Sequence, residues 1–331
     1  MRKTVFVFSD GELKRKHNTV FFETEDGEKR YLPIQDIGEI MAFGEITVNK
    51  RLLEFLGKKE VILHFFNYYG YYIGSFYPRE HMNSGYMTLR QAEHYLDHEK
   101  RITLARQFVL GAAQNMIQVL KYYERRGRLG SEIRLIIEEL ADELDACHDT
   151  DELMGIEGNM RNHYYKAFDQ ILDNPLFRFE KRSRRPPRNH MNTLISFGNS
   201  ILYTMVLSEI YKTHLDPRIG FLHATNFRRF SLNLDIAEIF KPIIVDRTIF
   251  TLVNRNQLTE SDFEKEMGGI MLKESGRKTF VAEMDRKLST TLTHEKTGRQ
   301  VSYRRLIRLE LYKLQKSLMG EEPYRPYVAR W

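Results

Sequence analysis

The spacing of apolar residues changes once along this chain, near residue 88, and that change limits the folds open to it. Before it, short apolar and aromatic runs alternate with turn signals such as Asp26-Gly27, a pattern that predicts β-strands. After it, apolar residues recur every three or four positions, as in amphipathic helices. The sequence therefore predicts an α+β protein, with a small N-terminal β-sandwich or sheet domain (residues 1–87) followed by a larger all-α C-terminal domain (residues 88–331).

The first part of the chain predicts five strands, at residues 5–8, 19–23, 30–33, 61–66 and 71–77. Asp10-Gly11 and Asp26-Gly27 follow the first two runs, and Asp-Gly is typical of a tight hairpin turn. A short helix is expected at residues 50–56. We interpret five tyrosines here as strand core and interface residues rather than as platforms for unpaired bases, namely Tyr68, Tyr69, Tyr71, Tyr72 and Tyr77.

The second part predicts helices at residues 88–127, 131–144, 151–172, 191–213, from 231 onward, 260–273 and 303–318. Ser131 and Ser231 stand where an N-cap is expected. Asn174-Pro175 ends the third helix, because the residue before proline disfavours helical geometry. Residues 176–190 then form a basic, proline-bearing loop.

Composition narrows the class of protein. The 331 residues are 42% hydrophobic and 29% charged, as in a globular chain, and no apolar run is long enough to span a bilayer. The single cysteine, Cys147, excludes an intrachain disulfide framework and a Cys-based zinc finger. We expect a cytoplasmic protein without a membrane partner, in which Cys147 is an ordinary packing residue.

Positive charge is concentrated in two segments, which favours a polyanionic partner. The formal net charge is +6. One segment surrounds Pro186-Pro187 and contains Lys181, Arg182, Arg184, Arg185 and Arg188. The other contains Arg299, Arg304, Arg305 and Arg308.

Glu157 is the first candidate for chemistry, since it falls on an apolar helical stripe. It lies four residues after Leu153 and three before Met160. Burying a carboxylate costs several kcal/mol (order of magnitude) unless a cation or hydrogen bonds meet it. Gly155 and Gly158 flank it, which predicts a close approach by another group. On helix position alone, a solvent-facing Glu at the edge of the stripe is the commoner arrangement.

Three further residues join this candidate set. His223 follows a proline-containing loop, and Asp235 and Glu238 project from one face of the helix that begins near Ser231. Acids near a helix start are also favourable for helix electrostatics alone. Two carboxylates and one imidazole, from Glu157, Glu238 and His223, suit Mg²⁺ or Mn²⁺.

The order of these motifs resembles the CRISPR-associated integrase/endonuclease family known as Cas1. The resemblance is carried by Ile156-Glu157-Gly158-Asn159 with Tyr164-Tyr165, by Gly220-Phe221-Leu222-His223, and by Leu234-Asp235-Ile236-Ala237-Glu238 followed by Lys241-Pro242. Residues 192–199 also resemble the family's helix before the histidine segment, except at Asn199, where a bulkier residue is expected.

The resemblance implies a metal-dependent DNA endonuclease and integrase that inserts foreign DNA into CRISPR arrays by transesterification. It implies that Glu157, His223 and Glu238 are catalytic residues that bind Mg²⁺ or Mn²⁺, with Asp235 as a supporting acid. It also implies a homodimer that works with the small companion protein Cas2 on double-stranded and branched DNA. Candidate phosphate contacts are Arg182, Arg184, Arg185, Arg188, Arg228 and Arg229.

Three other functions stay open at this stage. A metal-free DNA-binding assembly scaffold explains the basic segments but not a Glu on an apolar stripe. A metal-dependent RNase or phosphodiesterase predicts the same ligands and a strong effect of the 2′-hydroxyl. A purely structural dimer predicts no salt-dependent DNA affinity.

Overall fold

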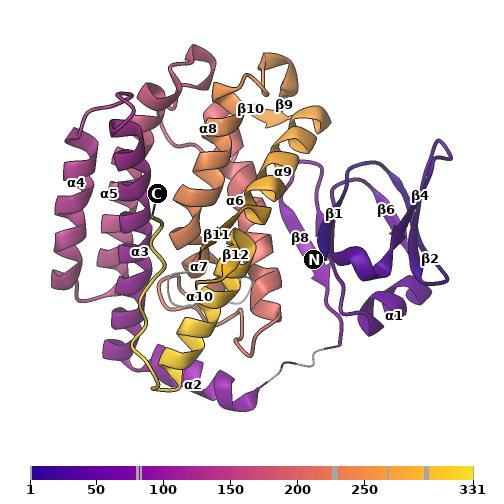
Figure 1. The fold of residues 1–331 in the computed structure, drawn as a ribbon, viewed down its shortest axis with the longest axis horizontal. Helices are drawn as coiled ribbons and strands as arrows, with labels where there is room; N and C mark the ends of the chain where they lie inside the picture. The colour runs from indigo at the N-terminus through magenta and orange to yellow at the C-terminus, as the bar shows by residue number, and fades with distance from the viewer. Residues whose placement is uncertain are drawn as a thin grey trace. The chain divides into compact units, whose positions relative to one another are not determined.

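The chain forms two compact units, Met1–His81 and Met82–Trp331. The computed structural model describes residues 2–79, 82, 84–225, 230–266, 268–293 and 298–330. Strands dominate the first unit and helices the second (Figure 1), so the predicted α+β class is confirmed. In the described ranges, no helix is long and apolar enough to cross a membrane.

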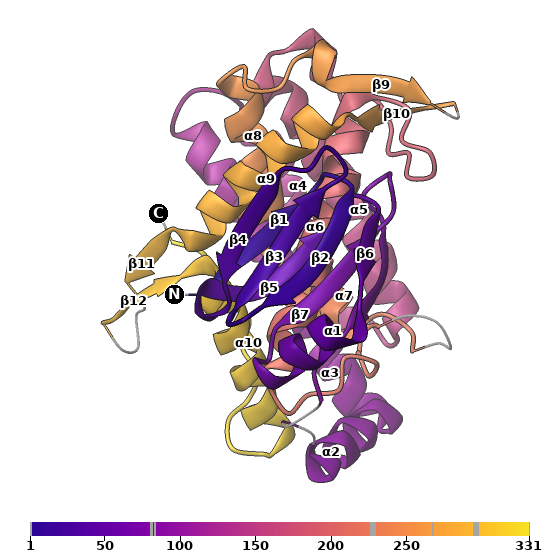
Figure 2. The ribbon, with the colours of Figure 1, turned by 90° about the vertical axis from the view of Figure 1, so that its right-hand side faces the viewer.

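The first unit contains two four-stranded sheets (Figure 2). One has the order β1-β5-β7-β8, formed by Lys3–Val7, Ile37–Ala42, Ile62–Phe66 and Tyr72–Phe76. The other has the order β4-β3-β2-β6, formed by Lys29–Pro33, Thr19–Thr24, Gly11–Lys16 and Ile46–Val48. The 3₁₀ turn η1 (Ile34–Asp36) leads from β4 into β5. Side chains from both sheets meet in one core that includes Leu13, Val20, Ile40 and Leu63.

Helix α1 (Lys50–Lys58) confirms the predicted short helix. Its N-cap is Asn49, whose side chain accepts a hydrogen bond from the Leu52 N–H at 3.0 Å. Leu52, Phe55 and Leu56 lie on one helical face and are buried in the core. The amphipathic spacing of this segment therefore decides both its helical form and its place in the core.

Only one of the two Asp-Gly pairs joins neighbouring strands of the same sheet. Asp26-Gly27 joins the antiparallel strands β3 and β4, as predicted for a hairpin. The hairpin prediction at Asp10-Gly11 is wrong, because β1 and β2 belong to different sheets. There, Asp10 Oδ1 accepts a hydrogen bond from the Glu45 N–H at 2.7 Å. Gly11 has a φ of 152°, and a Cβ on it would lie 2.2 Å from the carbonyl oxygen of Glu23.

The second unit contains nine α-helices within its described ranges. They are α2 (Gly85–Leu96), α3 (His98–Glu124), α4 (Glu132–Asp142), α5 (Thr150–Leu172), α6 (His190–Tyr211), α7 (Leu232–Lys241), α8 (Arg247–Asn254), α9 (Glu274–Ser289) and α10 (Tyr303–Leu318). The 3₁₀ turns η2 (Glu143–Ala146), η3 (Pro175–Phe177) and η5 (Glu260–Asp262) lie between them. A π-helical turn, η4 (Pro242–Asp246), joins α7 directly to α8.

The helix predicted at residues 260–273 is wrong. This segment holds η5 and an antiparallel pair, β9 (Phe263–Glu266) and β10 (Gly269–Leu272), and a second pair, β11 (Thr291–Thr293) and β12 (Gln300–Ser302), precedes α10. Gly268, between β9 and β10, has a φ of 75°, a backbone conformation that suits a turn and breaks a helix. The mainly helical unit therefore also contains two short two-stranded sheets.

The predicted caps Ser131 and Ser231 make no side-chain capping bond. Ser231 Oγ instead donates to the carbonyl of Arg218 at 2.8 Å and accepts from the N–H of Gly220 at 2.8 Å. Its hydroxyl thus binds the loop before His223 rather than the helix that follows.

The C-terminal segment runs along α3 after α10 (Figure 1). The buried side chain of Asn115 donates to the carbonyls of Ile239 and Tyr327, both at 2.9 Å, and accepts from the N–H of Ala329 at 2.8 Å. Gly111 allows this approach, because a Cβ there would lie 2.5 Å from Pro326. One side chain therefore joins α3, α7 and the C-terminal segment.

Candidate active site

Glu157 lies on α5, whose N-cap Asp149 accepts hydrogen bonds from the N–H groups of Asp151 and Glu152. The apolar stripe is as predicted, since Leu153 and Met160 are fully buried. The Glu157 side chain keeps 21% of its surface exposed. Its carboxylate therefore sits at the border between the core and solvent, where a cation can reach it.

The two glycines beside Glu157 face open space within the described part of the chain. A Cβ on Gly155 or on Gly158 would meet nothing within 4 Å among the described residues. Among the described residues, therefore, no other part of the chain approaches α5 closely at these positions. The structure offers no physical reason for glycine there.

Arg161 lies one turn after Glu157 on α5 and binds the Glu157 carboxylate. Its Nε donates to Glu157 Oε1 at 3.2 Å, and its Nη2 donates to Glu238 Oε2 at 2.9 Å. Only 7% of Arg161 is exposed. A buried guanidinium costs free energy unless carboxylates surround it, and here it joins α5 to α7. Arg161 was not among the predicted site residues, although its i,i+4 spacing from Glu157 was a usable signal.

Glu238 is almost fully buried and lies between two cations. Besides Arg161, Lys241 donates from Nζ to Glu238 Oε1 across one turn of α7. Burial favours the neutral acid, but the charges of Lys241, Arg161 and His223 outweigh it and lower the pKa of Glu238 to about 2. Glu238 is therefore a carboxylate throughout the physiological range.

His223 is held by Asp235, which is fully buried at the start of α7. Asp235 accepts the backbone N–H groups of Phe221, Leu222 and His223 at 2.6, 3.1 and 3.0 Å, and lies 2.8 Å from His223 Nδ1. Burial opposes the charged imidazolium, yet the Asp235 hydrogen bond and the charges of Asp235 and Glu238 raise the pKa of His223. Occupying Nδ1 leaves Nε2 as the ring nitrogen available for chemistry.

The loop that carries His223 is also held from α2 and α3. Gln91, which is fully buried, donates to the carbonyls of Asp216 and Ile219 at 3.1 Å each and accepts from the Asp216 N–H at 2.7 Å. Arg101 Nε donates to the carbonyl of Phe221 at 3.0 Å. Neither residue was among the predicted site residues, because the bonded pairs are more than a hundred positions apart and no local spacing signals them.

Asp246, the last residue of η4, lies on the far side of Arg161. The distance from its Oδ2 to Arg161 Nη1 is 4.0 Å, and both atoms are buried without a hydrogen-bond partner among the described residues. Burial raises the pKa of Asp246 to about 7 against the opposing charges of Arg161 and Lys241. Asp246 was not among the predicted site residues.

The donor types present fit a hard divalent cation. Glu157 and Glu238 provide carboxylate oxygens, and His223 provides a ring nitrogen whose partner nitrogen is oriented by a carboxylate. Arg161 and Lys241 hold these acids, however, and across the described ranges no three His, Cys, Asp or Glu side chains converge closely enough to hold a metal ion. Both carboxylate oxygens of Glu238 are bonded, one to Arg161 and one to Lys241, so a metal ion at Glu238 would displace at least one of these cations.

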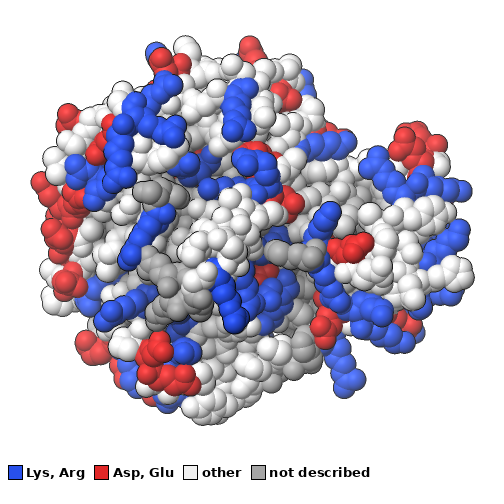
Figure 3. Space-filling model, in the orientation of Figure 1, with Lys and Arg blue, Asp and Glu red and all other residues white. Residues whose placement is uncertain are grey.

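The basic loop divides into an anchor and exposed side chains. Arg182 is half-buried and donates to Asn192 Oδ1 at 2.9 Å and to Ser196 Oγ at 3.1 Å, which attaches the loop to α6. Arg184, Arg185 and Arg188 are exposed. The predicted contacts Arg228 and Arg229 lie outside the described residues. On the face in Figure 3, acidic side chains gather at the edge formed by α4, and Lys and Arg side chains are spread over the rest of the second unit.

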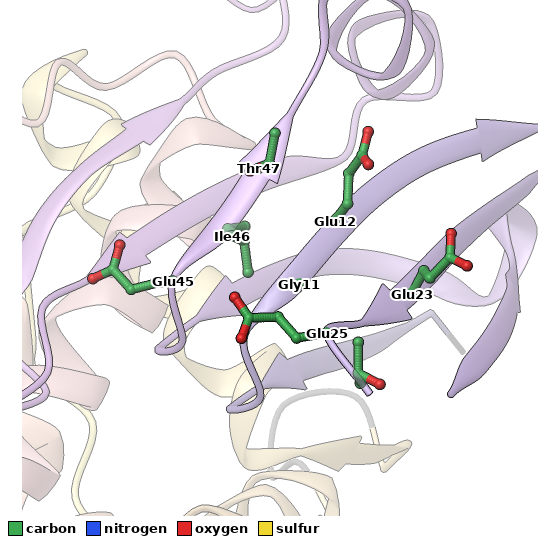
Figure 4. A pocket seen from close by; sticks show the side chains of 8 residues that line it. Gly11, Glu12, Glu23, Glu25, Glu45, Ile46 and Thr47 are labelled. Carbon is green, nitrogen blue, oxygen red and sulfur yellow. The ribbon is translucent and has the colours of Figure 1, made fainter. Parts of the chain in front are cut away.

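The first unit has an open hollow of about 400 Å³ whose lining includes Glu12, Glu23, Glu25 and Glu45. Their carboxylates do not converge on one point (Figure 4). Lys14 pairs with Glu12 at 2.5 Å and lies 3.9 Å from Glu23. These acids therefore form a solvated rim rather than a candidate catalytic site.

The chain is similar in sequence and in fold to known proteins of one family. The family model described as "CRISPR associated protein Cas1" matches residues 5–286. Along its whole length the chain is 60% identical to "CRISPR-associated endonuclease Cas1 2" of Thermodesulfovibrio yellowstonii, with 100% of each chain covered. It superposes on a Cas1 protein from Thermotoga maritima with a TM-score of 0.89 at 49% identity, over 98% of this chain and 99% of that one.

Two more distant structures share the fold. One is "Casposase bound to integration product", with a TM-score of 0.89 at 21% identity over 99% of this chain and 96% of that one. The other is a chain of a "Cas6-RT-Cas1--Cas2 complex", with a TM-score of 0.83 at 18% identity over 100% of this chain and 36% of that one. Because the family model spans most of the sequence and a relative matches at 60% from end to end, this chain belongs to the CRISPR-associated Cas1 family.

Proposed function

We propose that this protein is a metal-dependent DNA endonuclease and integrase that acts on double-stranded and branched DNA. The observation that carries the proposal is the charge network in which Arg161 joins Glu157 to Glu238, with His223 beside Glu238 and oriented by Asp235. The names of the Cas1 endonuclease relatives support the activity. The fold shared with a casposase bound to an integration product is consistent with strand transfer.

We assign the chemistry to Glu157, His223 and Glu238, with Mg²⁺ or Mn²⁺ as the cofactor. When bound, the cation supplies charge that offsets the negative charge developing on the scissile phosphate. Glu157 and Glu238 would hold it through carboxylate oxygens, and His223 through Nε2. Asp235 fixes the ring orientation of His223 and keeps Nδ1 occupied, so only one ring nitrogen faces the reaction.

Arg184, Arg185 and Arg188 are proposed phosphate contacts, because they are exposed arginines of the basic loop. We further propose that the protein is a homodimer and that it works with Cas2. Solved Cas6-RT-Cas1--Cas2 complexes, which share this fold, support that partner.

The test is strand transfer and cleavage on a branched DNA substrate with Mn²⁺, Mg²⁺ or EDTA. Wild type is compared with His223→Ala and with His98→Ala, which removes an exposed histidine of the same unit. We expect metal-dependent activity in wild type and His98→Ala and its loss in His223→Ala. Activity retained by His223→Ala overturns the site. DNA binding without activity, with Cas2 present, supports the scaffold alternative, and a preference for RNA supports an RNase.

A further inference from the structure

The Arg161 guanidinium lies near three carboxylates from three segments, but it forms hydrogen bonds to only two of them. Its Nε and Nη2 form hydrogen bonds to Glu157 and Glu238 at 3.2 and 2.9 Å. Its Nη1 stops 4.0 Å from Asp246 Oδ2, beyond hydrogen-bond distance. In the present arrangement the guanidinium thus sits on the two acids proposed to bind the metal, and only approaches the third.

Asp246 is buried beside Arg161 and Tyr164. It is 1% exposed, and neither its Oδ2 nor Arg161 Nη1 has a hydrogen-bond partner among the described residues. A buried acid and a buried N–H that face each other without bonding are costly in this state, and a short movement of one toward the other removes that cost. Burial raises the pKa of Asp246 to about 7 even though Arg161, Lys241 and the Tyr164 hydroxyl favour the charged form, which agrees with a carboxyl that is not yet fully paired.

A divalent cation at Glu157 and Glu238 would compete with Arg161 for the same oxygens and repel its charge. Lys241 also contacts Glu238, but the described residues offer it no second carboxylate within ion-pair distance. Arg161 has such an alternative in Asp246. We propose that Asp246 is a positioning residue for metal loading, which receives Arg161 when a divalent cation takes over Glu157 and Glu238. This inference rests on the ligand assignment in the proposed function.

The experiment measures Mn²⁺ affinity of the full chain without DNA, by electron paramagnetic resonance of free and bound Mn²⁺. Wild type, Asp246→Asn, Arg161→Gln and the double variant form a cycle. We expect Asp246→Asn to weaken Mn²⁺ binding by about tenfold, because the displaced guanidinium of Arg161 would have no carboxylate to pair with. Arg161→Gln should bind Mn²⁺ at least as tightly as wild type, and adding Asp246→Asn to it should change nothing further.

Two controls separate this idea from its alternatives. Glu310→Gln alters another buried acid of the unit, one bonded to Tyr324 and Lys313, and should leave Mn²⁺ affinity unchanged. Glu157→Gln tests the ligand assignment itself, since Mn²⁺ binding that survives this change overturns the proposed site whatever Asp246 does. Thermal unfolding of each variant shows whether it is folded.

Unchanged Mn²⁺ affinity in folded Asp246→Asn overturns the proposal. So does a loss of the same size in the presence and absence of Arg161, because Asp246 would then act by another route. If Arg161→Gln does not fold, Arg161→Lys replaces it in the cycle. The compact ammonium of lysine lacks the planar fork by which Arg161 spans Glu157, Glu238 and Asp246, so Asp246→Asn should then weaken Mn²⁺ binding less than it does in wild type.

Discussion

Asp235 Oδ1 lies 2.8 Å from His223 Nδ1, and the same carboxylate accepts three consecutive backbone N–H groups of the loop that carries the histidine. One buried acid on α7 thus sets both the shape of the loop and the orientation of the ring. The acidic side chain replaces a conventional turn of backbone hydrogen bonds, and Gly220 leaves it room, since a Cβ there would lie 2.8 Å from Asp235 Oδ2.

Replacing Asp235 with Asn should therefore affect stability and chemistry together. The amide offers one acceptor oxygen where the carboxylate offered two, so we expect a loss of about 1–3 kcal/mol in unfolding free energy. Activity should fall by about 10–100-fold as His223 loses its fixed orientation. Denaturant unfolding and strand-transfer rates measure these effects. Asp216→Asn, in the same loop but paired with the exposed Arg218, is the control and should retain activity.

Asp246 predicts a pH dependence of stability with a definite sign. Its pKa is raised from 3.8 to about 7 in the folded protein, so between these values the folded state binds more protons than the unfolded state. Its contribution is fully present below about pH 4 and is lost as the pH rises through 7. Relative to wild type, Asp246→Asn should gain up to about 4 kcal/mol across this interval. A difference independent of pH, in unfolding titrations, would contradict this.

Glu238 predicts the opposite trend at low pH. Its pKa is lowered from 4.5 to about 2, so its contribution is present above 4.5 and is lost as the pH falls toward 2. Glu238→Gln should flatten this acid limb of the stability curve. Acid titrations followed by circular dichroism, with Glu139→Gln as an exposed control, check the expectation. An unchanged acid limb in Glu238→Gln would show that other carboxylates dominate it.

The basic loop predicts a salt effect that depends on which arginine is changed. Replacing Arg184, Arg185 and Arg188 together with Gln should weaken DNA binding and reduce the slope of log K against log salt by about 0.9 for each phosphate that the variant no longer neutralises. Arg182→Gln should instead destabilise the loop, because Arg182 bonds to Asn192 and Ser196. Fluorescence anisotropy at several salt concentrations measures the slopes. A triple variant with the wild-type slope rules out a role for these three arginines in phosphate binding.

Asn115 predicts that the C-terminal segment supports α7. Asn115→Ala leaves the carbonyls of Ile239 and Tyr327 and the N–H of Ala329 without this partner, which should cost about 3 kcal/mol of unfolding free energy. Amide exchange should accelerate at Ala329 well before global unfolding. Gln118→Ala, a half-buried position on the same helix, should change little. Equal exchange in the two variants would show that packing alone holds the segment.

Sequence patterns were sufficient where burial and local propensity agree. Residues 303–318 were predicted as a helix and form α10 with those bounds, because their apolar spacing matches one buried face. The same reasoning failed at residues 260–273, where the tendency of Gly268 to turn prevailed over a weak helical period. At Asp10-Gly11, local turn chemistry could not show that the flanking strands pair with different partners.

The residues of the candidate site also fall into two groups, those that sequence motifs identify and those that only the fold brings together. Glu157, His223, Asp235 and Glu238 were identified by sequence motifs. The spacing of Arg161 from Glu157 was a local signal for that pair, but the bond from Arg161 to Glu238, 77 positions later, could not be read from the sequence. Gln91 and Asp246 stay hidden for the same reason, since each acts on a partner that only the fold brings near. Long-range polar contacts leave no period in a sequence, so a single sequence cannot reveal them.

The π turn between α7 and α8 fixes the rotation of Asp246 relative to Glu238 about the helix axis. In a continuous α-helix, a residue eight positions after Glu238 would be rotated from it by roughly 80° about the axis. Pro242 has no N–H to donate to the carbonyl of Glu238, and the wider spacing of η4 absorbs the rotation. Glu238 and Asp246 thereby face the same guanidinium. A chain one residue shorter here would keep every side chain of the site, and its helix would turn the second acid away.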